Sequence, residues 1–177
     1  PPQSGDDRIL ESMNRPYDTS FFRDRIEKAR EISGAISIGT DIITGFPGED
    51  DASFRRTYDF VMSLPLTYFH VFGFSRRPGT PAGTMSGQVE PETRKRRSRK
   101  LIRLGKEKKY DFMRSRTGTR ELSIIQGKAK RYSRFSTALT GSSCEVYVAC
   151  PPVLDGKLMP VDITHYSRGR LYGRIGR

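Results

Sequence analysis

The chain contains the stretch Asp41-Ile42-Ile43-Thr44-Gly45-Phe46-Pro47-Gly48-Glu49, and this stretch decides the fold of the first half of the molecule. A β-branched run at 36–43 leads into it, and an amphipathic helical pattern at 51–63 follows it. A buried strand that ends at glycines and a proline and then enters a helix predicts a strand-to-helix turn. Ligands collect at that end of the sheet in parallel α/β proteins, and Gly45 and Gly48 would let the backbone pass close to one.

A second apolar strand is predicted at 67–74, about thirty residues after the first, which is typical of a βαβ unit with a right-handed crossover. Both strands are apolar at nearly every position, as in a parallel sheet that is covered on both faces. Two strands do not make a stable sheet alone. We therefore expect residues 1–80 to be an α/β block that belongs to a larger parallel sheet or barrel. An uncovered apolar sheet edge would make such a fragment self-associate.

The positive charge lies in the second half of the chain. Residues 1–93 carry 10 Lys+Arg against 14 Asp+Glu, residues 94–116 carry 12 against 2, and residues 117–177 carry 10 against 4. After a Pro/Gly-rich loop, the block 81–116 is predicted to become a helix with one apolar face and a basic remainder. This charge density favours nucleic acid over an anionic membrane, and a solvated helix face is the alternative. The RNA-binding candidates here are Arg94, Lys95, Arg96 and Arg97.

Residues 117–177 change from a helical to an alternating pattern. Short apolar segments separated by glycines predict a small, closed, OB-like antiparallel β-barrel, so that the whole chain is α/β plus all-β. Such barrels bind RNA by combining basic side chains with aromatic platforms, and a place in the core is the alternative for each aromatic residue. The RNA-binding candidates in this block are Arg131, Tyr132, Arg134, Tyr166 and Arg168.

Two cysteines, Cys144 and Cys150, bracket one predicted strand. Six residues of strand separate their Cα atoms by about 20 Å. A disulfide needs less than about 7 Å, so the two cannot pair, and for the same reason they cannot share a metal ion. Scarce cysteine indicates a reducing compartment, and no stretch approaches the roughly 20 apolar residues of a membrane span. We expect a cytoplasmic protein without a secretory signal, whose natural N-terminus lies before Pro1.

Several motifs occur in the order and spacing of one family. In the first half these are MxRxY, DIIxGFPGE, HVF, FSxRxGT and AxxMxxQV. With them the chain resembles the back half of the radical S-adenosylmethionine (SAM) methylthiotransferases that modify tRNA, and its last block resembles their closing TRAM domain. Pro2–Asp7 resembles the end of the family's fourth barrel strand. The other matching segments are residues 13–17, 41–49, 70–80 and 82–89.

The resemblance implies three parts: 1–80 as the C-terminal part of the radical SAM (β/α) barrel, 81–116 as a basic linker helix, and 117–177 as an RNA-binding TRAM barrel. It implies an enzyme that adds a methylthio group to a modified adenosine beside the anticodon, with the anticodon stem-loop of tRNA as partner. The HVF and GTPA–M–QV runs favour threonylcarbamoyladenosine. The alternatives are isopentenyladenosine, a ribosomal protein as substrate, and a non-catalytic RNA-binding module.

The resemblance also implies a SAM site and iron–sulfur clusters. The family holds its [4Fe-4S] clusters with a CxxxCxxC motif and three further cysteines, which this chain lacks, so we expect the fragment to be inactive alone. Arg15 and Arg77 would bind a carboxylate or phosphate, because the guanidinium presents paired donors. The expected SAM neighbours are Gln3 and Ser4 at the ribose, Ile43 against the adenine, and the main chain of Val71 and Phe72 at the adenine edge. Gly45 would leave room for SAM at the turn.

Three other polar residues of the first half are predicted to be structural. Asp41 and Glu49 lie at the end of the first strand, where an acid often caps the following turn, and nothing in the sequence pairs them for acid/base chemistry. His70 lies in an apolar strand with no acid or cysteine at ligand spacing, which favours a core histidine over a catalytic one.

Overall fold

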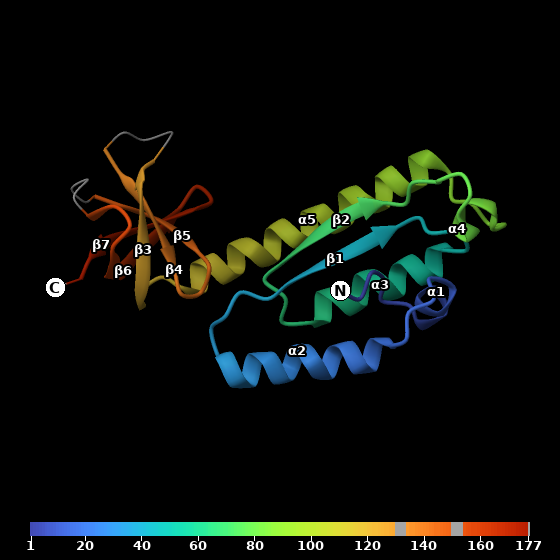
Figure 1. Cartoon of the computed structure of the whole chain (residues 1–177), viewed down its shortest axis with the longest axis horizontal. Helices are drawn as coiled ribbons and strands as arrows, with labels where there is room; N and C mark the ends of the chain where they lie inside the picture. The colour runs from blue at the N-terminus through green and yellow to red at the C-terminus, as the bar shows by residue number, and fades with distance from the viewer. Residues whose placement is uncertain (130–133, 150–153, 177) are drawn as a thin grey trace. The chain divides into compact units, whose positions relative to one another are not determined.

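The computed structural model describes residues 1–129, 134–149 and 154–176 (Figure 1). The chain divides into two compact units. The first unit contains Pro1–Gly34 and Ile38–Lys108, and the second contains Ala35–Ser37 and Lys109–Arg177. Across the part of the chain that the structure describes, none of the helices is both long and apolar enough to cross a bilayer.

The first unit is built on a parallel pair of strands, β1 (Gly39–Thr44) and β2 (Tyr68–Gly73), with α3 (Asp51–Ser63) between them in sequence. The predicted βαβ unit is therefore confirmed. Gln3 forms an isolated parallel bridge to Ile42, so the N-terminal segment adds a short third pairing on the other side of β1. This three-segment arrangement is compatible with a piece of a larger parallel sheet.

Three helices of this unit begin after an aspartate. The helices α1 (Asp7–Ser12), α2 (Thr19–Ser33) and α3 follow Asp6, Asp18 and Asp50. Each carboxylate accepts a hydrogen bond from the backbone N–H three residues later. The cap satisfies an N–H group that has no partner within the helix and places negative charge at the positive end of the helix dipole. These local contacts determine where the helices begin.

The core of the first unit lies on one face of the sheet. Ile42, Val61, Leu64 and Leu101 are each at most 1% exposed. They join the sheet to α3 and to the long helix α5 (Pro91–Ser115), which follows the short α4 (Pro81–Thr84). In Figure 1, α5 runs beside β2 and α3 beside β1.

The other face of this sheet is open. Along β1 and β2 the covered positions alternate with exposed or half-buried ones, since α2, α3 and α5 all pack on the same side. The prediction that both faces are covered is wrong for the described residues. It also misplaced His70, whose side chain is exposed on the open face instead of buried in a core.

The second unit is a closed five-stranded barrel, as predicted, with strand order β3-β4-β5-β7-β6. Its core includes Ile125, Val146, Val161 and Leu171, all 0% exposed. One part of the prediction is corrected, because β5 and β7 pair in parallel and the barrel is not antiparallel throughout. The strands are β3 (Arg120–Lys128), β4 (Ser136–Thr140), β5 (Glu145–Val148), β6 (Leu158–Ser167) and β7 (Arg170–Ile175).

Candidate cofactor face and RNA-binding surfaces

The turn after β1 is organised by Glu49. Its Oε1 accepts a hydrogen bond from the backbone N–H of Gly45 at 2.9 Å and another from Nη1 of Arg97 at 2.8 Å. Nη1 of Arg97 also donates to the Glu49 carbonyl at 2.9 Å, and Nη2 donates to Asp51 at 2.7 Å. Burial raises the pKa of Glu49, and the Gly45 N–H and the Arg97 charge only partly offset this effect. Glu49 is therefore structural, as predicted.

Two cations that were expected to bind RNA, Arg94 and Arg97, instead contact this turn or its neighbours. Arg97 is 4% exposed and bound to two carboxylates, so it is not available to phosphate. Arg94 donates to the Phe74 carbonyl, and its methylene stem fills the space beside Gly45. Both assignments are corrected, because the two side chains point into the first unit. Lys95 and Arg96 remain exposed.

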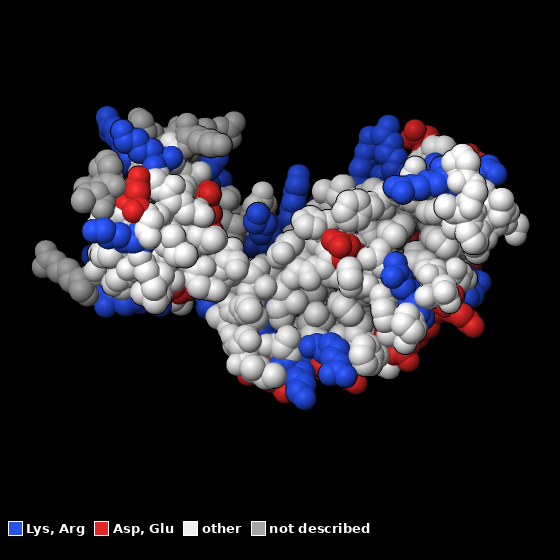
Figure 2. Space-filling view, in the orientation of Figure 1, with Lys and Arg blue, Asp and Glu red and all other residues white. Residues whose placement is uncertain are grey.

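The open face of the β1–β2 sheet carries a row of cross-strand neighbours. The ring of Tyr68 lies against Gly39, Nδ1 of His70 lies 3.1 Å from Asp41, and Phe72 is level with Ile43. The rings of Tyr68 and Phe72 both contact the His70 ring edge-on, with centroids 5.5 and 6.4 Å away. Figure 2 shows few charged side chains over β1 and β2. This face is accessible and largely aromatic, and Asp41 and His70 form a polar pair within it.

The predicted SAM neighbours fit this face only in part. Ile43 is half-buried and Phe72 is 53% exposed, so together they offer an apolar surface of the kind that an adenine ring contacts. The side chain of Val71 packs against the core, and only its main chain can serve the predicted role.

The remaining SAM candidates lie on or behind the sheet. Gln3 is half-buried, with φ at 65°, and its main chain is bonded to β1. Ser4 is 0% exposed, and its hydroxyl lies 3.1 Å from that of Thr57, so the structure does not place Ser4 on the open face. Gly45 has φ at 72°, but the Arg94 stem occupies the room beside it. Gln3 is thus the better candidate of the N-terminal pair.

The two arginines proposed for a carboxylate or phosphate are exposed. Arg15 follows α1, and Arg77 lies in the segment between β2 and α4. The structure does not bring them together in one site. Among the residues that the structure describes, no group of three or more His, Cys, Asp or Glu side chains could hold a metal ion. Cys144 is buried in the barrel wall, which raises the pKa of its thiol, and Cys150 lies outside the described residues.

An aromatic cluster covers part of the barrel surface. The ring of Tyr172 on β7 is stacked on His165 at 4.9 Å and lies 5.7 Å from Tyr147 and 5.8 Å from Phe135. Tyr172 is level with Tyr147 on β5 and with His165 on β6, so the cluster spans three neighbouring strands. Only the strand register reveals that Tyr147, Tyr172 and His165 adjoin one another.

The barrel residues predicted to bind RNA have different surroundings. Tyr166 packs at the edge of the barrel core, with Arg114 at 5.4 Å over its ring and Tyr110 beside it, so it is not a free stacking platform. Arg134 and Arg168 are exposed. Arg168 and Gly169 both have positive φ in the turn between β6 and β7, which places the arginine at the tip of a hairpin. Arg131 and Tyr132 lie outside the described residues.

No family model matches the chain. Curated relatives match nearly all of it, and three of them carry the name tRNA-2-methylthio-N(6)-dimethylallyladenosine synthase. The Magnetococcus marinus protein is 31% identical over 99% of the chain, which spans 40% of that relative. A Xylella fastidiosa protein is 33% identical over 99% of the chain, which spans 35% of it. The Sphingopyxis alaskensis protein is 35% identical over 93% of the chain, which spans 37% of it.

The relatives correct one expectation and confirm another. Their names specify dimethylallyladenosine, so they do not support the preference for threonylcarbamoyladenosine that two motifs suggested. The chain spans well under half the length of each, which agrees with the resemblance to the back half of such enzymes. Over nearly its whole length this chain is similar to one part of tRNA methylthiotransferases, in agreement with its resemblance to their C-terminal region.

Proposed function

We propose that the protein containing this chain adds a methylthio group to N6-dimethylallyladenosine in tRNA, next to the anticodon. In this proposal the chain supplies one wall of the SAM site and part of the RNA-binding surface. The observation that carries it is 31 to 35% identity, over 93 to 99% of the chain, to relatives named for that product. The iron–sulfur clusters of the enzyme would be held by residues outside this chain.

The open face of the β1–β2 sheet would hold the adenine end of SAM. When bound, SAM supplies the methyl group and, after reductive cleavage, the radical that activates the base. Ile43 and Phe72 would contact the adenine ring, and the outer main-chain edge of β2 would hydrogen-bond its polar edge. Gln3 would lie near the ribose. Arg77 would compensate the charge of a carboxylate or phosphate.

The barrel and the basic helix would hold the tRNA. The cluster of Phe135, Tyr147, His165 and Tyr172 offers ring faces for unpaired bases, and Arg134 and Arg168 are exposed cations of the same unit. A subset of the exposed Lys and Arg side chains of α5 would contact phosphates. Affinity would then depend on both stacking and the release of counterions.

Binding of this chain to a tRNA transcript at several salt concentrations tests the RNA part of the proposal. If about five cations touch phosphate, log affinity falls with log salt at a slope of about −3.5 to −4.5. An affinity that does not change with salt would contradict phosphate binding by this chain. The modification itself requires the whole protein and is tested in cells that lack its gene.

A further inference from the structure

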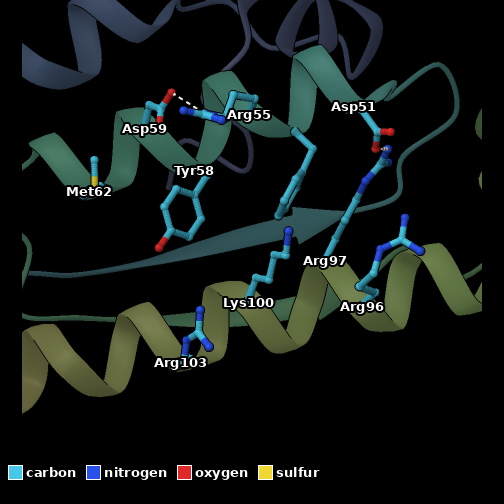
Figure 3. Close-up of a pocket in the computed structure, with 10 residues that line it drawn as sticks. Asp51, Arg55, Tyr58, Asp59, Met62, Arg96, Arg97, Lys100 and Arg103 are labelled. Atoms are coloured by element: carbon cyan, nitrogen blue, oxygen red, sulfur yellow. Dashed lines mark hydrogen bonds and ion pairs between the residues drawn. The ribbon is translucent and has the colours of Figure 1, made fainter.

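A groove of about 560 Å³ lies between α3 and α5 in the first unit (Figure 3). It is separate from the open face of the β1–β2 sheet, because these helices cover the opposite face. The α3 wall carries Phe54, Tyr58 and Met62, one helical turn apart. The α5 wall carries Arg96, Lys100 and Arg103. An aromatic and apolar wall thus faces a cationic one.

The acids of the groove already have partners. Asp51 is bound by Arg97 at 2.7 Å, and Asp59 is bound by Arg55 at 3.1 Å, as the dashed lines in Figure 3 show. Arg97 is itself held by the buried Glu49, and its guanidinium lies 5.4 Å from the Phe54 ring. Asp51 also interacts electrostatically with Arg96, so the positive charge of the α5 wall is only partly neutralised from across the groove.

The three cations of the α5 wall have few competing contacts. Lys100 has no hydrogen bond or ion pair with any described residue. Arg103 has only a 3.9 Å contact to Glu107, on its own helix. Arg96 donates a long hydrogen bond of 3.5 Å to Oγ1 of Thr93 on its own helix. It is exposed and points toward the groove in Figure 3, as do Lys100 and Arg103. These cations lie beside Tyr58, whose ring is half-buried, lines the groove and packs against the core of the first unit on its other side.

We propose that this groove binds a strand of RNA, with successive phosphates along Arg96, Lys100 and Arg103 and a base or ribose against Tyr58. Seven residues of helix separate the first and last cation by about 10 Å, a row longer than one phosphate group. Aromatic side chains beside a positively charged groove are the combination that binds single strands without sequence preference. The inference rests on the proposed function and adds a second RNA contact, apart from the barrel.

Two triple variants with the same change in charge test this inference. R96Q/K100Q/R103Q removes the groove cations, and R99Q/K106Q/K109Q removes three exposed cations of the same helix that do not line the groove. Binding of an unmodified tRNA transcript is measured against salt for the wild-type chain and both variants. We expect the groove variant to flatten the salt slope by about 2 to 3, at 0.7 to 0.9 for each lost contact, and the control to change it by less than about 1.

Tyr58 supplies a second measurement that does not depend on charge. Y58A should weaken RNA binding without changing the slope, because stacking releases no counterions, and Y58F should bind as the wild type does. Photo-crosslinking of the wild-type chain to a 4-thiouridine-containing RNA should label the peptide that contains Tyr58. Thermal unfolding of each variant checks that it remains folded.

The results of these experiments distinguish failure of the groove proposal from failure of the proposed function. Equal salt slopes in the two triple variants, or wild-type affinity of Y58A for RNA, would overturn the proposal that the groove binds RNA. Either result would leave RNA binding by the barrel intact. Absence of any salt-dependent binding by the wild-type chain overturns both the groove and the RNA part of the proposed function. A slope lost only in the groove variant, with a crosslink at Tyr58, establishes the groove as an RNA site.

Discussion

Arg97 and Glu49 form a buried ion pair, with 2.8 Å between Nη1 and Oε1 and side chains that are 5% and 1% exposed. The pair joins the first turns of α5 to the glycine turn after β1, which are 48 residues apart in sequence. Among the described residues, Oε2 of Glu49 and Nε of Arg97 have no hydrogen-bond partner. The pair is therefore only partly satisfied, and each member depends on the other.

Replacing Arg97 with Gln should destabilise the first unit strongly. The substitution leaves the Glu49 carboxylate buried without its cation, which costs about 3–5 kcal/mol for pairs of this kind. The free energy of unfolding in urea measures the loss. Arg99→Gln is the matched control on the exposed side of the same helix and should change it by less than about 0.5 kcal/mol.

The loss in R97Q should also depend on pH. Burial already raises the pKa of Glu49, and removing Arg97 raises it further. A carboxyl group with a raised pKa in the folded protein favours folding while it is protonated, and this contribution is lost as the pH rises through that pKa. R97Q should therefore lie closer to the wild type at about pH 5 than at about pH 8. A deficit that is the same at both would show that Glu49 is not the cause.

Gly45→Ala should destabilise more than Gly48→Ala. Both glycines have positive φ, at 72° and 84°, so either substitution adds backbone strain of about 1–2 kcal/mol. At Gly45 the new Cβ would lie 1.9 Å from Cγ of Arg94, whereas nothing lies within 4 Å at Gly48. Thermal unfolding of the two variants compares them directly. Equal melting temperatures would mean that the Arg94 stem moves aside freely.

Asp6 should contribute to stability at neutral pH and lose this contribution in acid. Burial alone would raise the pKa of Asp6, but Arg56 and the Ile9 N–H together lower it below its ordinary value of 3.8. A lowered pKa stabilises the folded state above that value, and the contribution falls as the pH drops through the folded pKa.

Asp6→Asn tests this assignment. Asparagine can still cap α1 but cannot pair with Arg56, so we expect a loss of about 1–2 kcal/mol near pH 7 and little loss below about pH 3. Urea unfolding across this range provides the measurement. Asp24→Asn, at an exposed position of α2, is the control and should leave the pH profile unchanged.

Tyr172→Ala should weaken RNA binding, whereas Tyr166→Ala should mainly weaken the barrel. Tyr172 is the centre of the surface cluster, and loss of one stacked base costs about 1–3 kcal/mol. The salt slope should not change. Tyr166 lies under Arg114 at the edge of the core. Fluorescence anisotropy with RNA and thermal unfolding separate the two effects, and Y172F should retain binding.

The βαβ unit and the barrel could be predicted because each follows from a local pattern, namely apolar strands around a helix and alternation between glycines. The orientation of the basic helix α5 could not be predicted from the sequence. Arg94 and Arg97 carry the same charge as Lys95 and Arg96, and only packing against Glu49 and the β1 turn decides which of them are buried.

Strand register was the other missing information. His70 was expected in a core because its neighbours are apolar, but its face of the sheet is open and Asp41 lies beside it. On the barrel, Tyr172 was not recognised because its contacts with Tyr147 and His165 depend on how three strands align. A sequence pattern places a residue on a face of a strand but does not identify its cross-strand neighbour.

The most direct test of the proposed function is the nucleoside composition of tRNA from cells in which the gene encoding this chain is deleted. Mass spectrometry should show loss of 2-methylthio-N6-dimethylallyladenosine and accumulation of N6-dimethylallyladenosine, and the whole gene should reverse both changes. Unchanged 2-methylthio-N6-dimethylallyladenosine, or loss of the methylthio group from threonylcarbamoyladenosine instead, would contradict the proposed function.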